Sequence, residues 1–372
     1  MSPHPSVATR TAAAHRARGP AVALLVLLVL LATLLGACSD ADGEGPRIAL
    51  LLPETKTARY ETQDRPAFEA RLAEVCPDCV AMVHNAGHDA ARQQAQAEAA
   101  LTNGASVLVL DPVDAVSAGV IARHADASGV PVITYDRILF DAPVTFHITF
   151  DNERVGMLQA QSLVDAVGDT IDDGWIVVLN GAATDANAAE FRRGASLVFD
   201  SQQVGIGAEV DVPDWSPELA QERMERAIAT LGRETIVGVY SANDAMAGGA
   251  IAAMRSAGLS PIPPTTGQDA ELAALRRIIT GDQHMTVFKS FRTQAQVAAE
   301  VAYVLSRDGT LPPGIATSQT DNGHGPVPTL RLTPVAVTRD TIARTVVADG
   351  MWTVAELCDG LEEACARIGL TG

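Results

Sequence analysis

The chain has 372 residues, a length typical of about two domains, and 47% of its residues are hydrophobic but only 4% aromatic. This composition excludes a mainly disordered chain and requires cores made of aliphatic side chains. With 45 acidic and 27 basic residues the formal charge is −18, which argues against nucleic acid or anionic lipid as the main partner.

The N-terminal segment has the features of an export signal. An uncharged apolar run, residues 21–35, follows a segment that carries arginines and no acidic residue, and it is too short to span a bilayer comfortably. The sequence LGAC at 35–38 resembles the lipobox of bacterial lipoproteins, in which cleavage precedes a cysteine that carries the lipid. An ordinary signal peptide and an uncleaved anchor are the alternatives. We expect a lipoprotein signal peptide at 1–37, a lipid on Cys38, and a flexible tether at 38–46.

The other cysteines form two local pairs, Cys76 with Cys79 in C-P-D-C and Cys358 with Cys365. Export to an oxidising compartment favours two disulfides. A zinc site built from both pairs and a thioredoxin-like redox motif at the first pair are alternatives. The redox motif needs a first cysteine that opens a helix after a strand, whereas Cys76 follows an expected helix.

Strand and helix patterns alternate behind the tether. Continuous apolar runs, typical of strands buried on both faces, predict strands at 48–52, 79–84, 106–112 and 131–136. Helical patterns and helix-stop residues predict helices at 64–75, 89–103 and 115–127. This order predicts a parallel, doubly wound sheet.

The pattern then restarts in a second α/β unit without a low-complexity linker. Strands are predicted at 175–181, 205–211, 235–241, 265–269 and 285–289. Helices are predicted at 152–167, 187–200, 216–231, 243–257, 270–280 and 291–307. The Gly- and Pro-rich stretch 310–334 is expected to hold loops and a crossing strand. We therefore expect an α/β fold of two doubly wound, parallel-sheet lobes.

Polar side chains follow the strands of both units, where doubly wound sheets bind their ligands. The strand-end residues are Arg59, Tyr60, Asp136, Arg137, Asn180, Asp185, Asn243, Asp244, Gln268, Asp269 and Lys289. Carboxylates, amides and guanidinium groups complement sugar hydroxyls, which both donate and accept hydrogen bonds. Tyr60 and Trp215, both in expected loops, are candidates to stack on a sugar ring, with loop packing as the alternative. Asp244 is expected to cap the helix 243–257.

Catalytic and cofactor motifs are missing from the sequence. It contains no G-x-S-x-G, no H-E-x-x-H and no Gly-rich phosphate loop. We therefore expect no catalytic residue, no metal and no cofactor. The alternative is a glycosidase that uses Asp185 and Asp269 as acid and base. A sugar-responsive repressor is excluded by the export signal and by the absence of N-terminal DNA-binding helices.

Several motifs in a fixed order carry a family resemblance. They are YDR (135–137), FDNERVG (150–156), DANAAEFRRG (185–194), SANDAMAGGAI (241–251), TGQDAEL (266–272) and MTVFK (285–289). Together they resemble the periplasmic D-xylose-binding proteins, within the type I sugar-binding proteins of bacterial ABC importers, over residues 47–350. Single motifs of this length are weak, whereas the ordered set is specific.

The resemblance implies two lobes joined by three crossovers, at 150–152, 285–289 and 320–334. The first lobe would contain 47–148 and 290–323, and the second 149–289 and 324–372. It implies an extracytoplasmic monomer, attached to the cell membrane only by its lipid, that binds a monosaccharide and delivers it to an ABC permease. D-xylose is the favoured sugar; a broader set of aldoses, and a sensor role toward a chemoreceptor or kinase, are the alternatives.

The resemblance also implies which side chains contact the sugar. They are Arg59, Asp136, Arg137, Asp185, Asn243, Asp269 and Lys289, with Trp215 as the second stacking aromatic. Tyr60 stands where the family typically has Trp. Asn187 is a weaker candidate, because the family's D-N-N reads D-A-N here. MTVFKS replaces a typical M-T-V-Y-K-P, so the second crossover lacks the rigidity of a proline.

Overall fold

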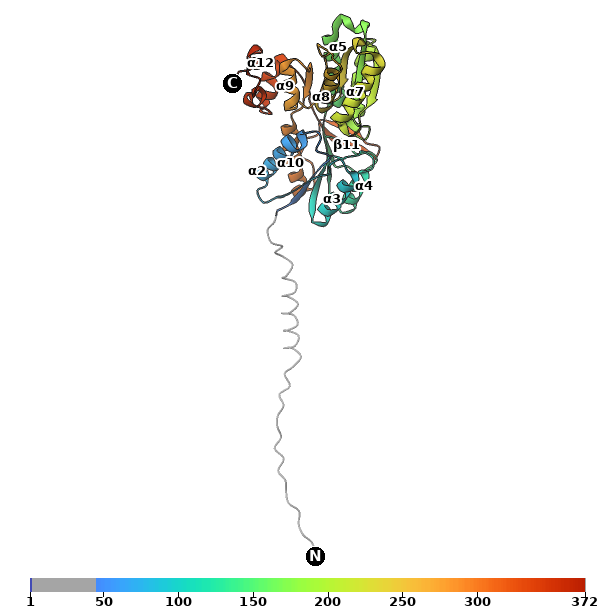
Figure 1. Ribbon diagram of the computed structural model, residues 1–372. Coiled ribbons are helices and arrows are strands. Elements are labelled where there is room, and N and C mark those ends of the chain that lie inside the picture. The colour runs from blue at the N-terminus through green and yellow to red at the C-terminus, as the bar shows by residue number, and fades with distance from the viewer. Residues whose placement is uncertain (2–44, 372) are drawn as a thin grey trace. The chain divides into compact units, whose positions relative to one another are not determined.

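The computed structural model describes Met1 and residues 45–371 (Figure 1). The expected signal peptide, the lipid-bearing Cys38 and nearly all of the tether lie outside the described residues. Among the described helices, none is long and apolar enough to cross a membrane.

The first lobe is built on a seven-stranded sheet in the order β10-β11-β5-β4-β3-β1-β2. Its strands are β1 (Arg47–Leu52), β2 (Val80–Asn85), β3 (Ala105–Leu110), β4 (Val132–Tyr135), β5 (Phe146–Phe150), β10 (Ser318–Asp321) and β11 (Pro326–Leu332). Neighbouring strands run parallel except β10 and β11, which are antiparallel. The central strand β1 is buried from Ile48 to Leu52, as its continuous apolar run predicts.

Helices cover both faces of this sheet. On one face α2 (Arg65–Val75) packs against α10 (Phe291–Asp308), and on the other lie α3 (Ala90–Thr102) and α4 (Gly119–Ala127) (Figure 1). A π-helical turn, η1 (Tyr60–Asp64), leads into α2. The turn η1 contacts α10, and it places Arg59 and Tyr60 at the carboxyl end of β1.

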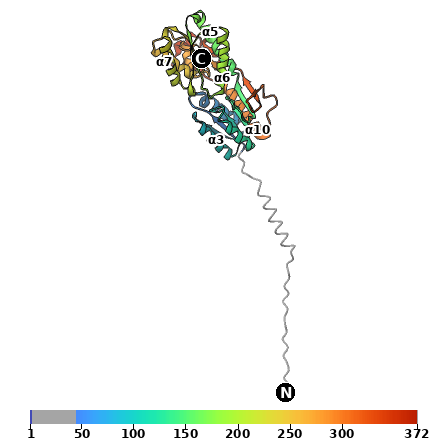
Figure 2. The ribbon, with the colours of Figure 1, turned by 90° about the vertical axis from the view of Figure 1, so that its right-hand side faces the viewer.

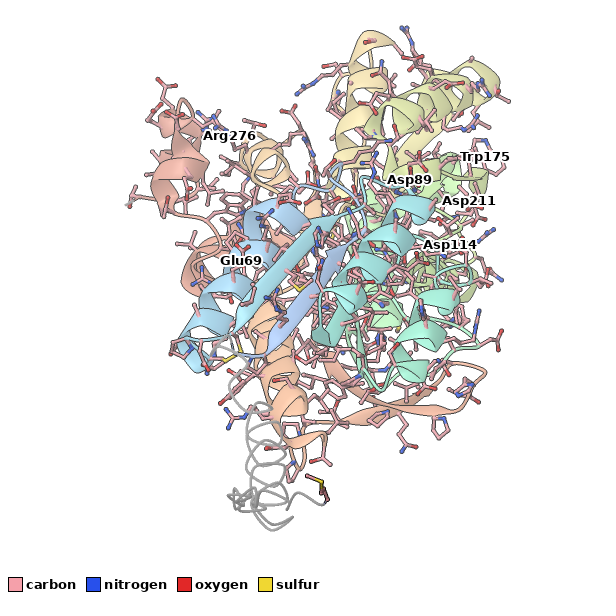
Figure 3. All side chains as sticks on the ribbon, turned by 90° about the horizontal axis from the view of Figure 1, so that it is seen from below. Glu69, Asp89, Asp114, Trp175, Asp211 and Arg276 are labelled. Carbon is pink, nitrogen blue, oxygen red and sulfur yellow. A yellow bond between two sulfur atoms is a disulfide. The ribbon has the colours of Figure 1, made fainter. Side chains whose placement is uncertain are left out.

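The second lobe contains a three-stranded parallel sheet, β7-β6-β8. Its elements are β6 (Trp175–Asn180), β7 (Ile206–Asp211), β8 (Ile236–Ser241), α5 (Asn152–Val167), α6 (Ala186–Ser201), α7 (Pro217–Leu231) and α8 (Asp244–Ser256). Helices α5 and α6 pack together, as do α7 and α8 (Figures 1 and 2). Trp175, which is labelled in Figure 3, stands at the start of β6. It is 43% exposed and lies against Gly205 and Gly207.

The strand predicted at 265–269 does not form. Thr265 forms a single bridge to Val239. Further along, the Gly267 carbonyl accepts from Val287 N and Asp269 N donates to the Val287 carbonyl, but no continuous strand results. Pro263 and Pro264 precede it and have no backbone N–H to donate, and Asp269 ends the stretch in a left-handed conformation with φ 91°.

The rest of the chain forms a short ribbon and a C-terminal segment. The ribbon pairs β9 (Met285–Phe288) with β12 (Val335–Thr338) in an antiparallel arrangement. The remaining helices are α9 (Leu272–Thr280), α11 (Val354–Cys358) and α12 (Glu362–Arg367). The short turns are η2 (Gly168–Asp173), η3 (Pro213–Trp215), η4 (Arg233–Thr235), η5 (Arg339–Thr341) and η6 (Ala343–Val347). The C-terminal segment packs its apolar side chains on α9.

Both expected disulfides are formed, Cys76–Cys79 and Cys358–Cys365. Their sulfur atoms are therefore not available as zinc ligands. Across the described residues, no group of three or more His, Cys, Asp or Glu side chains is arranged to hold a metal ion.

The chain passes between the lobes three times, and one predicted boundary is wrong. The passages lie at Asp151, at Lys289–Ser290 and at residues 333–334, between elements that pack in different lobes. The division at 323/324 would assign β11 to the second lobe, but β11 pairs in parallel with β5 in the first sheet. A crossing strand was expected within 310–334, but β11 lies wholly in the first lobe, so the last crossover follows Leu332.

Candidate functional site

All ten side chains expected to contact a sugar line one cavity between the lobes. Its empty volume is about 280 Å³. The expected residues on its wall are Arg59, Tyr60, Asp136, Arg137, Asp185, Asn187, Trp215, Asn243, Asp269 and Lys289. Thr57, Phe191 and Gln268 complete the lining. The carboxyl ends of strands from both lobes thus meet at this cavity, as the topology predicts.

Arg59 organises the first-lobe wall. Its guanidinium donates two hydrogen bonds to Asp64, at 2.9 and 2.8 Å, and one to Asp136 Oδ2 at 3.3 Å. The ring of Phe291 lies 3.6 Å from the guanidinium carbon. Burial alone would raise the pKa of Asp136, but the charge of Arg59, followed by those of Lys289 and Arg137, lowers it below its ordinary value. Asp136 is therefore an ionised acceptor.

Arg137 joins the two lobes. Its Nε lies 2.8 Å from Asp185 Oδ2 of the second lobe, and its Nη2 donates to the Tyr60 hydroxyl at 3.3 Å. Asp111 stands behind it, with Oδ1 3.6 Å from Arg137 Nε. Burial raises the pKa values of Asp111 and Asp185, while the charge of Arg137 opposes both shifts. Asp111 was not singled out by the sequence as a site residue.

Lys289 lies at the second crossover, inside a group of aromatic rings. Its Nζ lies 2.8 Å from Asp269 Oδ1 and 5.4 to 5.7 Å from the ring centres of Phe150, Phe191 and Phe291. Such contacts stabilise a buried ammonium group whose hydration shell has been removed. Lys289 therefore presents a fixed cation to the cavity.

The two neighbours Asn243 and Asp244 have roles that differ from the sequence prediction. Asn243, not Asp244, caps α8, because its side chain accepts from Met246 N at 2.9 Å. The Asp244 carboxylate instead accepts from Glu271 N at 3.0 Å and from Thr286 Oγ1 at 2.8 Å. Asp244 thereby holds in place the loop that contains Asp269, whose backbone is left-handed.

The two aromatic candidates are both buried, Tyr60 at 2% and Trp215 at 4% exposure. The Trp215 indole lies directly over Gly181, where an added Cβ would come within 2.0 Å of the ring. It also meets Phe191 edge to face, with ring centres 6.3 Å apart. Trp215 is thus a fixed wall, and its position requires glycine at residue 181.

Asn187 spans the lobes by hydrogen bonds. Its Nδ2 donates to the Asp136 carbonyl at 3.3 Å, and its Oδ1 accepts from Asn152 Nδ2 at 2.9 Å. Asn152 braces the first crossover in this way, while Asp151 caps α5. Asn187 therefore has a structural task beside its place on the cavity wall.

Five buried polar atoms of the cavity-lining residues have no hydrogen-bond partner in the part of the chain that the structure describes. Two of them, Arg137 Nε and Asp269 Oδ1, lie within ion-pair distance of Asp185 and Lys289. The other three, Asp136 Oδ1, Trp215 Nε1 and Gln268 Oε1, have neither kind of partner. A buried polar atom without a partner is costly, so such atoms indicate a place for a ligand. Both acceptors and a donor are represented, which suits hydroxyl groups.

The residues that the sequence missed had partial signals. Phe191 lies four residues after Asn187, so both face the same side of α6. Gln268 was noted as a strand-end residue but not assigned a contact. Thr57 had no such signal, because it lies in the irregular segment between β1 and η1.

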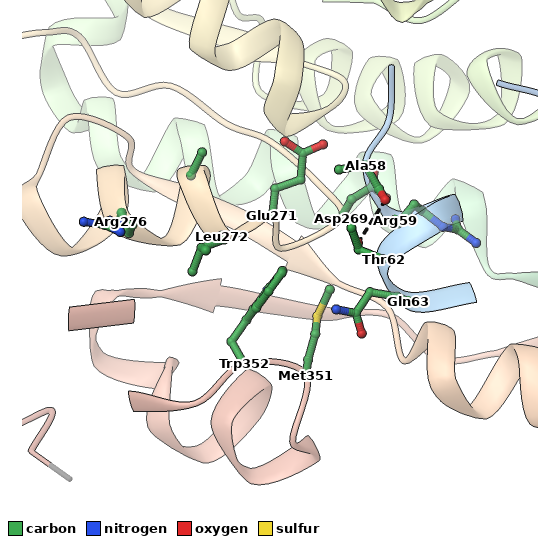
Figure 4. A pocket seen from close by; sticks show the side chains of 11 residues that line it. Ala58, Arg59, Thr62, Gln63, Asp269, Glu271, Leu272, Arg276, Met351 and Trp352 are labelled. Carbon is green, nitrogen blue, oxygen red and sulfur yellow. Dashed lines mark hydrogen bonds between the residues drawn. The ribbon is translucent and has the colours of Figure 1, made fainter. Parts of the chain in front are cut away.

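A larger hollow lies beside the cavity and shares Arg59 and Asp269 with it (Figure 4). Its empty volume is about 1070 Å³, and Leu272, Met351 and Trp352 form apolar walls. Trp352 Nε1 donates to the Ala270 carbonyl at 2.9 Å, which fixes the indole against the Asp269 loop. Its charged residues are Arg59, Asp269, Glu271 and Arg276, of which the first two also line the smaller cavity.

Comparisons with known proteins agree with this architecture. The family described as "Periplasmic binding protein domain" matches residues 48–310. The D-xylose-binding periplasmic protein of Escherichia coli (strain K12) is 34% identical over 336 residues, which cover 89% of this chain and 98% of the relative. The chain belongs to the family of periplasmic sugar-binding proteins.

Other members of the family are similar in sequence and in structure. The multiple sugar-binding periplasmic receptor of Rhizobium radiobacter is 32% identical over 290 residues, covering 72% of this chain and 81% of the relative. An ABC transporter solute-binding protein from Clostridium phytofermentans, solved with bound β-D-glucose, has a TM-score of 0.77 and 27% identity. That match covers 84% of this chain and 99% of the solved chain.

Family membership decides two of the earlier expectations. The predicted α/β fold of two lobes with parallel sheets is confirmed. Periplasmic sugar-binding proteins are extracytoplasmic solute-binding proteins and not enzymes, so the glycosidase alternative is wrong. Asp185 and Asp269, its proposed acid and base, are instead paired with Arg137 and Lys289.

Proposed function

We propose that this periplasmic sugar-binding protein takes up one neutral monosaccharide in the cavity between its lobes and delivers it to an ABC permease. The observation that carries the proposal is the set of unpartnered buried atoms, Asp136 Oδ1, Trp215 Nε1 and Gln268 Oε1, on the wall of a cavity of about 280 Å³. A sugar ring with its hydroxyls would satisfy them, and the Trp215 indole would pack on its C–H face.

The charge balance of the wall favours an uncharged ligand. Three carboxylates and three cations line the cavity. Two further carboxylates, Asp64 and Asp111, stand behind Arg59 and Arg137. No excess positive charge remains to offset a sugar carboxylate or phosphate, so burying an anion there would be costly.

D-xylose is the sugar we favour. Two relatives named as D-xylose-binding proteins, from Escherichia coli and Haemophilus influenzae, are 34% and 33% identical to this chain. A broader aldose set is the second candidate, because Tyr60 replaces the typical tryptophan. Its smaller ring leaves more space, and its hydroxyl, bonded to Arg137, adds a polar group to the wall.

Binding to a sugar panel tests the proposal. The full chain is titrated with D-xylose, L-arabinose, D-glucose, D-galactose and D-glucuronate by calorimetry and tryptophan fluorescence. We expect at least one neutral aldose to bind and to shift the fluorescence through Trp215, and D-glucuronate to bind at least tenfold more weakly. If no monosaccharide gives a heat signal or raises the melting temperature, the proposal is wrong.

The importer role and the membrane attachment complete the proposal. We place a lipid on Cys38 after removal of residues 1–37, with the following residues as a tether to the lobes. Labelling of cells with a fatty-acid analogue should mark the wild-type protein and not a Cys38→Ser variant. Deletion of the protein should abolish uptake of the sugar; intact uptake with lost sugar-induced transcription would instead support the sensor alternative.

A further inference from the structure

Asp214, the residue before Trp215, reaches across the mouth of the cleft to the first lobe. Its Oδ1 lies 2.8 Å from His88 Nε2, and its Oδ2 lies 3.7 Å from Lys56 Nζ. None of these three residues lines the sugar cavity. The contacts are therefore made between the lobes and outside the binding site.

The two first-lobe partners are held by their own loops. His88 N donates to the Pro53 carbonyl at 2.8 Å, and Asn85 Nδ2 donates to the Glu54 carbonyl at 2.9 Å. These bonds fasten the loop after β2 to the loop after β1, which carries Lys56. The first lobe thus presents two donors, His88 and Lys56, to the Asp214 carboxylate. A neutral His88 imidazole can donate if its hydrogen is on Nε2.

The second-lobe side of the contact has an unusual backbone. Asp214 and Trp215 both have left-handed φ angles, 58° and 54°. Aspartate tolerates this conformation, but it is costly for a bulky residue such as Trp215. Asp214 is about half exposed while the neighbouring Trp215 is buried. Such a backbone conformation persists only when surrounding contacts hold it. Here the buried Trp215 ring and the contacts of Asp214 with the other lobe do so.

We propose that Asp214 with His88 and Lys56 forms a latch across the cleft, which holds Trp215 over the bound sugar and slows the sugar's release. The inference rests on the proposed sugar binding at this cavity. Because the latch forms only after the lobes meet, it should leave the entry of the sugar unchanged and act on its dissociation.

The rate of sugar dissociation, measured on variants of the latch residues, tests the proposal. D-xylose, or D-glucose if the titrations favour it, is mixed with the full chain in a stopped-flow instrument and followed by tryptophan fluorescence. Asp214→Asn retains a side chain that tolerates the left-handed backbone. We expect Asp214→Asn and His88→Ala each to raise the dissociation rate about two- to fivefold, the effect of an exposed ion pair. His88→Gln can still donate a hydrogen bond to Asp214, so its dissociation rate should stay close to that of wild type.

A matched control and a double variant make the test specific. Asp211 is about as exposed as Asp214 but pairs with Arg192 within its own lobe, so Asp211→Asn should leave the rates unchanged (Figure 3). His88→Ala with Asp214→Asn should be no worse than Asp214→Asn alone. Additive effects, or a change confined to association, would overturn the latch.

Cross-linking separates this inference from the proposed function. In a His88→Cys, Asp214→Cys variant, a short bis-maleimide should join the two positions, and added sugar should speed the reaction. If no monosaccharide binds but the cross-link forms, the sugar proposal fails and the cross-lobe contact remains supported. If sugar binds and no cross-link forms, the latch is wrong.

Discussion

At the scale of single residues, Arg137 is the candidate sugar contact that also joins the two lobes. It lies 2.8 Å from Asp185 in the other lobe, and Asp111 stands behind it. Arg137→Ala would remove a charged donor worth about 1.5–3 kcal/mol and leave buried carboxylates unpaired. We expect sugar affinity, measured by calorimetry, to fall at least tenfold.

Arg192→Ala is the matched control for that experiment. Arg192 is half exposed and pairs with Glu209 on the surface of the second lobe, so its removal should leave the affinity within about twofold of wild type. If the Arg137→Ala variant binds the sugar as tightly as wild type, Arg137 does not contribute to sugar binding.

Gly181 is the second residue for which the structure predicts a clear effect of substitution. A methyl group there would come within 2.0 Å of the Trp215 ring, and the ring is held between Gly181 and Phe191. Gly181→Ala should displace the indole, weaken sugar binding by about tenfold or more, and reduce the fluorescence change, since overpacking of this kind costs about 1–3 kcal/mol. Gly205→Ala, beside the exposed Trp175, is the control and should bind sugar normally. Unchanged titration curves for Gly181→Ala would show that Trp215 does not contact the sugar.

At the scale of elements, the sequence predicted strands well where they are central and buried. The apolar runs of β1, β3 and β6 needed no tertiary information, because both faces of these strands are covered. The antiparallel pair β10–β11 was not predicted in detail, since Pro326 and Pro328 favour a loop until pairing with β5 outweighs them.

The positions of the site residues could be predicted from the strand pattern, but their contacts could not. Strand ends give the positions of side chains such as Asp136 and Lys289 without any knowledge of contacts. The role of Asp244 could not be foreseen, because its partners Gln283 and Thr286 lie about forty residues away in the chain and come together only in the fold.

The loop held by Asp244 makes folding stability depend on pH. Burial, together with the charges of neighbouring carboxylates, raises the pKa of Asp244 to about 7 and that of Glu271 to about 8. The folded protein therefore keeps protons that the unfolded chain releases above about pH 4, so stability falls as pH rises from there toward about 8. Glu271→Gln removes one of these groups, and its melting temperature should fall less than that of wild type between about pH 5 and pH 8.

The control for this pH effect is a carboxylate on the surface. Glu222 pairs with Arg226 along α7 and is about half exposed, so Glu222→Gln should follow the wild-type pH profile. Profiles of Glu271→Gln and wild type that run parallel would mean that Glu271 does not keep its proton in the folded state.

At the scale of the whole described unit, the contacts between the lobes explain how ligand and conformation are coupled. Arg137 with Asp185, Asn187 with the Asp136 carbonyl, and Ala115 N with the Thr184 carbonyl all join one lobe to the other. Closure also buries unpartnered atoms such as Asp136 Oδ1. A sugar that satisfies these atoms lowers the free energy of the closed state only, and so it shifts the population toward closure.

This coupling predicts the behaviour of the protein in solution. The free protein should have a larger radius of gyration by small-angle X-ray scattering than the protein saturated with D-xylose, because water can hydrate the cleft carboxylates only when the lobes part. Arg137→Ala, measured at a sugar concentration that saturates it, should close less completely, since Asp185 loses its partner from the other lobe. Asp211→Asn, which alters no contact between the lobes, should close like wild type. Identical scattering with and without a sugar whose binding calorimetry has established would contradict closure as the response to the ligand.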